Sequence, residues 1–143
     1  MAHVVVTRDM HAPSQRVFDA LADQEGMSRW MPGRVRVVTT GPDGLVGTVR
    51  RMSVGVVTFD ERIVESDARS TFTYQLVRGV PFLARHRGIV SVQALAPTQS
   101  RVTWDIDFQL KVPIVSHIVL WFIAIGVRLA LAKLASQLEA VSR

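Results

Sequence analysis

Hydrophobic and polar residues alternate with a period of two through the middle of the chain, from Arg34 to Lys111, and turn residues interrupt the alternation at short intervals. A period of two predicts β-strands with one buried face. The predicted strands are residues 35–40, 47–54, 57–65, 71–77, 84–96 and 101–110. The connections between them are short enough for hairpins, so we expect an antiparallel meander.

Helical periodicity appears on both sides of this region. A short strand at residues 3–8 precedes a helix that begins near Pro13, because proline suits the first turn of a helix. A second short helix, capped by Asp23, should end at Pro32 and Gly33. A long helix is expected over residues 113–140, and it is apolar on almost every side. One side of this helix should cover the sheet, and the other should face a partner, a membrane or more protein.

Length and composition predict a single domain over residues 1–143. A chain of this size can bury a core without disulfides, and it contains no cysteine for disulfides, zinc ribbons or thiol nucleophiles. The net charge of +5 comes from scattered arginines, which favours solvated strand faces over a nucleic-acid site, so no nucleic-acid partner is expected. The first residues lack the apolar core of a secretory signal, which predicts a cytoplasmic location.

Residues 112–127 contain no charged side chain. A membrane span needs about 20 predominantly apolar residues, and this stretch is shorter and interrupted by Pro113, Ser116 and His117. The pattern favours a helix that closes a core or cavity, with membrane contact that is at most peripheral.

The turns of the predicted meander differ between its two ends. Residues 41–44, 66–70 and 97–100 are polar, whereas residues 54–56, 80–83 and 112–115 are apolar. Exposed loop tips are normally polar, so three apolar tips at one end indicate a surface that meets something apolar. One hypothesis is the mouth of a pocket, with Phe82 and Leu83 as a lid. The alternative is that these loops pack on the start of the last helix.

Strand alternation directs four polar residues to the apolar face, namely Arg50, Glu61, Tyr74 and His86. In a pocket, Glu61 or His86 could transfer protons and Arg50 could hold an anionic oxygen. For any one of them alone the simpler interpretation is favoured: an Arg50–Glu61 ion pair across neighbouring strands, with Tyr74 and His86 hydrogen-bonded in a core. The apolar residues predicted to bind ligand are Trp30, Met52, Phe59, Phe72, Phe82, Leu83, Val90, Trp104, Phe108, Trp121 and Ile125.

Other chemistry has little support in the sequence. The four histidines have no metal-site spacing, so no metal or other cofactor is expected. No G-x-S-x-G nucleophile elbow is present. Gly126 within the last helix predicts close approach of another group to the backbone there.

The sequence resembles the SRPBCC superfamily (START-like, birch-pollen-allergen-like), and within it the polyketide cyclase/dehydrase-like branch. The residues that carry the resemblance are Ala12 to Asp23, Met27 to Pro32, Gly47 to Arg50 and Val102 to Trp104. It implies an α+β helix-grip fold, in which a curved antiparallel sheet wraps around a long C-terminal helix and two short helices follow the first strand. It also implies a deep apolar cavity between sheet and helix.

The resulting expectation is a protein that binds a hydrophobic small molecule, such as a lipid, isoprenoid or polyketide. The resemblance to polyketide cyclases and aromatases suggests cofactor-independent aldol cyclisation or dehydration, in which Arg50 stabilises an enolate and Glu61, His86 or Tyr74 transfers protons. The alternative is a non-catalytic lipid or quinone carrier, or an adaptor that docks to a membrane or protein through its apolar loop end. The apolar last helix also suggests a homodimer.

Overall fold

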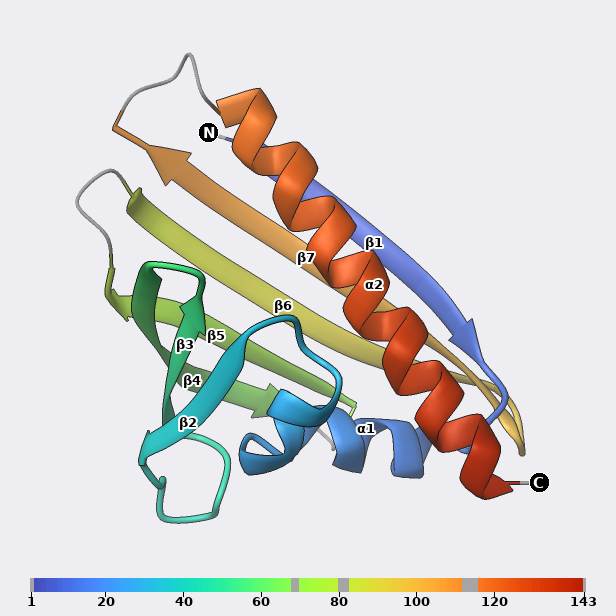
Figure 1. Cartoon of the computed structure of the whole chain (residues 1–143). Helices are drawn as coiled ribbons and strands as arrows, with labels where there is room; N and C mark the ends of the chain where they lie inside the picture. Colours follow the sequence, from blue (N-terminus) through green and yellow to red (C-terminus); the bar gives the residue numbers. More distant parts are fainter. Residues whose placement is uncertain (1, 68–69, 80–82, 112–115, 143) are drawn as a thin grey trace.

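A computed structural model describes residues 2–67, 70–79, 83–111 and 116–142 of the chain. Seven strands and two α-helices make up most of it (Figure 1). In chain order the elements are β1 (Ala2–Met10), α1 (Ser14–Ala22), the 3₁₀ turn η1 (Glu25–Arg29), β2 (Arg34–Thr39), β3 (Val49–Val54), β4 (Val57–Asp67), β5 (Thr71–Arg78), β6 (Leu83–Ala96), β7 (Gln99–Leu110) and α2 (Ser116–Ser142).

The strands form one antiparallel sheet in the order β1-β7-β6-β5-β4-β3-β2. The predicted six-stranded meander is therefore confirmed, and β1 joins it beside β7. The alternation on β7 is complete, since Val102, Trp104, Ile106, Phe108 and Leu110 are buried while the residues between them are exposed or half-buried. Such alternation buries one face of the sheet and leaves the other to solvent.

The long helix α2 runs along β1 and β7 and covers the buried face of the curved sheet (Figure 1). Its buried side consists of small and branched apolar residues, among them Val127, Leu131 and Leu134. The α+β helix-grip architecture predicted from the sequence is thus confirmed. Residues His117–Ala140 are long and apolar enough to cross a membrane by length and composition, but 33% of this stretch's most apolar window is buried in the fold.

The second short helix differs from the prediction, because η1 is a 3₁₀ turn rather than an α-helix. Runs this short commonly take the tighter 3₁₀ form. The N-cap position is occupied by Gln24 and not by Asp23. Asp23 still contributes to the start of the turn, since its Oδ1 accepts a hydrogen bond from the Gly26 N–H at 3.1 Å. The turn is followed by Gly33, whose φ of 91° favours glycine and whose missing Cβ leaves room for the Ser53 carbonyl.

Candidate functional site

A cavity of about 360 Å³ lies between the sheet and α2. It is lined mainly by apolar side chains from β3 to β7, the segment after η1, and the first half of α2. Small-molecule sites are usually cavities of this kind, with a few convergent polar groups. The lining residues are Met31, Pro32, Arg50, Met52, Val54, Val57, Phe59, Glu61, Tyr74, His86, Trp104, Ile106, Phe108, Leu110, Val119, Phe122, Ile123, Gly126 and Val127.

The cavity reaches the protein surface between the β3–β4 hairpin and the first turns of α2. Val54 and Phe122 both line it and are 46% and 63% exposed. This opening lies at the sheet end that the apolar turns had indicated. Residues 80–82 and 112–115, which belong to the predicted mouth, lie outside the described residues, and Phe82 with them. Leu83 begins β6, and its side chain also lies outside the description.

Arg50 and Glu61 form a buried ion pair across β3 and β4, and each side chain is only 1% exposed. Both Nε and Nη2 of Arg50 lie near the same oxygen, Glu61 Oε1, at 3.3 and 3.2 Å. The Nη1 group donates to Gln24 Oε1 at 2.7 Å and to the sulfur of Met27 at 3.0 Å. The simpler interpretation of Arg50 is therefore what the structure contains, and its nitrogens are largely occupied by protein groups.

The second carboxylate oxygen of Glu61 faces His86. Glu61 Oε2 lies 3.3 Å from His86 Nδ1, but the two are not aligned as a hydrogen bond. Glu61 Oε2 and His86 Nε2 are both buried without a hydrogen-bond partner among the described residues. Buried polar atoms are normally paired, because an unpaired one costs about 1–3 kcal/mol. Two such atoms on residues that line one cavity indicate a place for a polar group of a ligand.

Tyr74 connects this polar group to the aromatic wall. Its ring lies under the Arg50 guanidinium, 4.5 Å from the carbon Cζ to the ring centroid, and edge-to-face with His86 at 5.8 Å. Its hydroxyl oxygen accepts a hydrogen bond from Trp104 Nε1 at 2.8 Å. Burial raises the pKa of the Tyr74 hydroxyl well above its ordinary value, and the Glu61 carboxylate raises it further. The hydroxyl therefore keeps its proton and remains a donor at neutral pH.

The four polar residues expected on the apolar face all line the cavity, together with Met52, Phe59, Trp104 and Phe108. Three other expected lining residues, Trp30, Phe72 and Val90, are buried in the core outside it. The reason is that α1 and η1 fill that half of the sheet face. Phe18 of α1 packs edge-to-face on Phe72 at 6.1 Å, and Trp30 packs in the same way on Trp104 at 6.3 Å.

The two ligand-binding residues expected from α2 also lie outside the lining. Trp121 is 61% exposed, and Ile125 is half-buried. The one polar stripe of this helix contains His117, Arg128 and Glu139 and also Trp121, so it indicated that Trp121 faces away from the sheet. The rest of the helix is apolar, and this pattern did not distinguish Val119, Phe122, Ile123 and Val127 from Ile125. Gly126 does lie on the cavity wall, but the nearest atom to an added Cβ would be Pro32 Cγ at 3.9 Å, which is ordinary contact.

Strand alternation in the sequence could have identified other lining residues as well. Ile106 and Leu110 share the parity of Trp104 and Phe108, and Val57 shares that of Phe59. Met31 and Pro32 carried no such signal, because they lie in the connection after η1 and face the cavity only through the tertiary fold.

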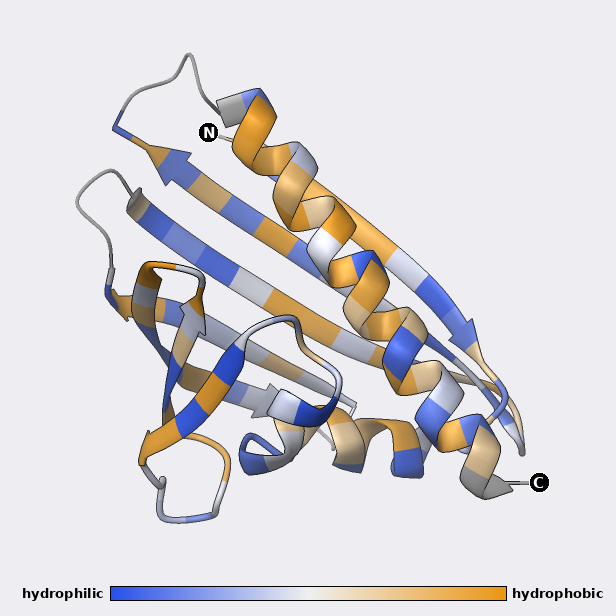
Figure 2. Ribbon diagram, viewed as in Figure 1, coloured by the Kyte–Doolittle hydropathy of each residue, from blue (hydrophilic) through white to orange (hydrophobic). Residues whose placement is uncertain are grey.

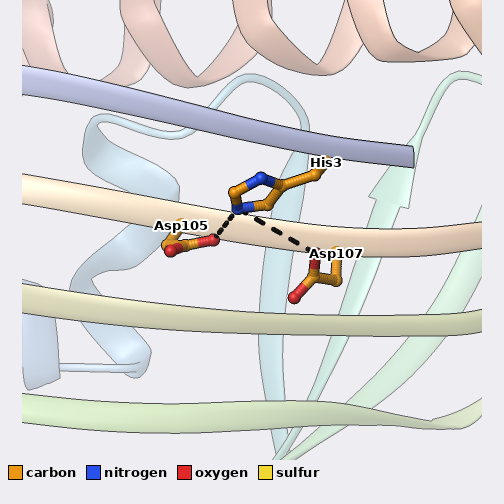
Figure 3. Close-up of side chains that lie close together, drawn as sticks. All are labelled: His3, Asp105 and Asp107. Atoms are coloured by element: carbon orange, nitrogen blue, oxygen red, sulfur yellow. Dashed lines mark hydrogen bonds and ion pairs between the residues drawn. The ribbon is translucent and has the colours of Figure 1, made fainter. Parts of the chain in front are cut away.

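A second cluster of titratable groups lies on the opposite, outer face of the sheet. His3 of β1 projects toward Asp105 and Asp107 of β7 (Figure 3), with Nε2 2.5 Å from Asp105 Oδ1 and 3.9 Å from Asp107 Oδ1. The hydrogen bond to Asp105 raises the pKa of His3. Arg87 is the cross-strand neighbour of Asp107 on β6. These opposite charges on a solvated face account for the cluster as cross-strand ion pairing.

Comparisons with known proteins agree with this geometry. Three similar structures are a START superfamily protein from Mycobacterium smegmatis (TM-score 0.84, 16% identity, 97% of this chain and 98% of that one), the ZhuI aromatase/cyclase from Streptomyces sp. R1128 (0.85, 19%, 99% and 96%), and norcoclaurine synthase from Thalictrum flavum (0.75, 15%, 99% and 88%). At these identities the likeness shows the fold. A search of curated proteins finds no match. The model of one family, described as polyketide cyclase / dehydrase and lipid transport, matches residues 1–142. The chain therefore belongs to the polyketide cyclase / dehydrase and lipid transport family.

Proposed function

We propose that this protein binds a mainly apolar small molecule in the cavity, with a polar group of the ligand directed to His86 and Glu61. The observation that carries the proposal is a pair of buried atoms without hydrogen-bond partners, Glu61 Oε2 and His86 Nε2, on two residues that line an otherwise apolar cavity. A carbonyl, hydroxyl or enol oxygen placed beside them would supply the missing hydrogen bonds. Lipids, isoprenoids and polyketides all combine such an oxygen with a large apolar surface.

The same atoms support acid–base chemistry on a polyketone. When the proton of a neutral His86 is on Nδ1, facing the carboxylate of Glu61, Nε2 carries a lone pair that can accept a proton from a carbon next to a ketone. Catalytic hydrogen bonds are often poorly aligned before substrate binds, as the 3.3 Å contact between Nδ1 and Oε2 is here. Removal of that proton gives an enolate, whose carbon attacks a second ketone carbon of the same chain. The C–C bond forms as the C=O π bond breaks, and the resulting alkoxide takes the proton back from Nε2. Loss of a second α-proton together with the new hydroxyl then releases water.

Arg50 has a supporting role in this proposal instead of the enolate-binding role expected from the sequence. Its guanidinium neutralises Glu61 from the side opposite His86 and is itself held by Gln24 and by the ring of Tyr74. This holds the second carboxylate oxygen of Glu61 toward the imidazole. The name of a structural neighbour, an aromatase/cyclase, suggests the same class of reaction.

Binding is tested by filling the cavity from the helix side. Gly126→Leu places a large side chain on the cavity wall, whereas Gly126→Ala is the matched control that adds only a methyl group where the nearest atom is 3.9 Å away. We expect Gly126→Leu to reduce the uptake of the fluorescent probe 8-anilinonaphthalene-1-sulfonate at least about tenfold, with circular dichroism unchanged, and Gly126→Ala to retain uptake. Equal uptake by both folded variants would show that the probe does not use this cavity.

Catalysis is tested with a synthetic poly-β-ketone thioester, whose cyclised and dehydrated products are separated by mass spectrometry. His86→Gln should lower the rate of cyclisation by about 10²–10⁴-fold while probe uptake remains. Wild-type cyclisation no faster than in buffer would leave binding as the function.

A non-catalytic carrier is the second candidate, and the exposed apolar opening formed by Val54 and Phe122 favours it. Native mass spectrometry of freshly purified protein distinguishes the two, since a carrier should retain a co-purified lipid, isoprenoid or quinone. The homodimer suggested by the apolar α2 stays a prediction. Sedimentation equilibrium of Trp121→Glu and Leu129→Glu tests it, because both side chains are exposed on α2 and a charge in a paired helix face should shift the mass to that of the monomer.

A further inference from the structure

Exposed apolar side chains gather around the cavity opening. Val54 and Val56 at the β3–β4 hairpin are exposed, as are Ile118, Trp121 and Phe122 in the first two turns of α2. In Figure 2 the hairpin and these first turns of α2 carry hydrophobic colour at the same end of the molecule. Scattered exposed apolar residues need no explanation, but a group of this size around the mouth of an apolar cavity marks an interaction surface.

Basic residues surround this group. The strand register places Arg34 at the start of β2, Arg78 at the end of β5, Arg85 near the start of β6 and Lys111 just after β7, all at the sheet end that contains Val54. All four are exposed. Within the described chain, no Asp or Glu occupies the last two strand positions at this end. The opposite end carries Asp9 at the end of β1 and Asp67 at the end of β4.

We propose that this mouth surface, made of the five apolar and four basic residues named above, docks on an anionic lipid bilayer, so that the cavity opening faces the membrane. The inference deepens the proposed function, on which it rests, by naming the partner from which an apolar ligand enters or to which it leaves. Apolar and tryptophan side chains insert at the level of the headgroups, while long basic side chains reach the phosphates.

Charge complementarity favours an anionic bilayer over a second copy of the chain. In a two-fold dimer the same surface meets itself, so the four basic residues of one copy would face those of the other. An anionic surface attracts all four of them together. The partial burial of α2 in the core limits the contact to its exposed side, so docking is peripheral and does not require the helix to leave the fold.

The test measures co-sedimentation of the full chain with vesicles of phosphatidylcholine, with or without phosphatidylglycerol. We expect binding to the phosphatidylglycerol vesicles, weak binding to pure phosphatidylcholine, and weakening by sodium chloride, because salt screens exposed charges. The absence of binding to phosphatidylglycerol vesicles, or equal binding to both kinds at all salt concentrations, overturns the proposal.

Two pairs of variants locate the contact. Val56→Ser/Trp121→Ser and Arg85→Glu/Lys111→Glu alter the mouth surface at residues that do not line the cavity, and each should weaken vesicle binding at least about tenfold. The matched controls are Val38→Ser/Leu129→Ser and Arg8→Glu/Lys133→Glu, which remove exposed side chains of the same kinds elsewhere on the sheet and helix. The controls should bind as the wild type does. Equal losses in variants and controls overturn the assignment to the mouth.

Two further measurements separate this inference from the function on which it rests. Uptake of 8-anilinonaphthalene-1-sulfonate in the absence of vesicles should be the same in all four variants, because none changes the cavity wall. Unchanged uptake with no vesicle binding would refute the docking proposal alone. A dimer seen by sedimentation equilibrium that Val56→Ser/Trp121→Ser dissociates, without vesicle binding, would instead assign the surface to a second copy.

Discussion

Two ion pairs on adjacent rungs of the β3–β4 ladder have the same chemistry and opposite surroundings. Arg51 and Asp60 lie on the other face of the sheet, where the Arg51 side chain is 32% exposed. Each oxygen of Asp60 accepts one hydrogen bond, with Nε 2.9 Å from Oδ1 and Nη2 3.1 Å from Oδ2. Arg50 and Glu61 point inward, and Arg50 uses two nitrogens on one oxygen, Oε1. The other oxygen is left beside His86. Both carboxylate oxygens of Asp60 are therefore hydrogen-bonded, whereas Glu61 Oε2 has no hydrogen-bond partner among the described residues. A binding site requires such an unsatisfied acceptor.

The largest expected difference between the two rungs is in stability. Arg50→Met leaves the Glu61 carboxylate buried without its cation, and this should lower the free energy of unfolding by about 3–5 kcal/mol in urea denaturation. Arg51→Met should have a smaller effect, because the Arg51 side chain is 32% exposed and solvent partly screens the pair, although Asp60 is only 10% exposed. Replacing both inner charges, as in Arg50→Met/Glu61→Leu, should recover much of the stability. Equal losses at the two rungs would show that burial does not distinguish them.

The shape of the inner cluster depends on Gly88, which lies beneath Tyr74. A Cβ at this position would lie 2.1 Å from Tyr74 Cζ, so Gly88→Ala must displace the ring that supports Arg50. We expect a loss of about 1–3 kcal/mol in thermal or urea unfolding, as for other overpacked cores. The contrasting variant Gly126→Ala meets no close atom and should stabilise α2 by about 1 kcal/mol. A neutral Gly88→Ala would mean that the ring shifts freely.

Tyr74 is the single tyrosine of the chain, so its titration at high pH reports on the inner cluster alone. Its pKa is raised in the folded protein, so the unfolded chain loses this proton first as the pH rises above about 10. The free energy of unfolding should therefore fall by up to about 1.4 kcal/mol per pH unit in that range, and tyrosinate absorbance should appear only with unfolding. Tyr74→Phe should remove this slope. Tyrosinate absorbance that appears in the folded protein near pH 10 would contradict the buried environment.

The smallest effect is expected on the outer face, at His3 and Asp105. The pKa of His3 is raised above its ordinary 6.5, so the pair adds stability below that pH and loses it as the pH rises through the raised value. Because the His3 side chain is 53% exposed and solvent screens the pair, the change should be slight. In Asp105→Asn, the pKa of His3 measured from its ring signals in an NMR titration should be lower than in the wild type. An unchanged His3 pKa in that variant would show that the hydrogen bond has no effect in solution.

Much of the inner face could be predicted from the sequence, because a strand has a period of two. Arg50, Glu61, Tyr74 and His86 share the parity of apolar neighbours on four successive strands, and all four line the cavity. The bulges on β4 did not invert this parity where it mattered, since Glu61 and Ile63 both remain buried. Arg51 has the opposite parity on β3, and its side chain is 32% exposed.

The limits of the cavity could not be predicted in this way. Phe72 and Val90 have the same parity as Tyr74 and Gly88, but α1 covers them, and nothing in the local pattern records which half of the sheet a separate helix will fill. On α2, Trp121 and Phe122 are neighbours with similar chemistry. Only Phe122 lines the cavity, because the packing of Val127 and Leu131 on the sheet sets the rotation of the helix.

The sequence by itself determined the meander, the long helix, the family resemblance and the set of polar side chains on the concave face, since each depends on local periodicity or on residues that are near in sequence. The tertiary structure decided which groups accept hydrogen bonds from Arg50, which oxygen of Glu61 stays unpaired, and where the cavity opens. Those properties depend on groups such as Gln24, Met27 and Gly126, which come from distant segments and meet only when the sheet closes around α2.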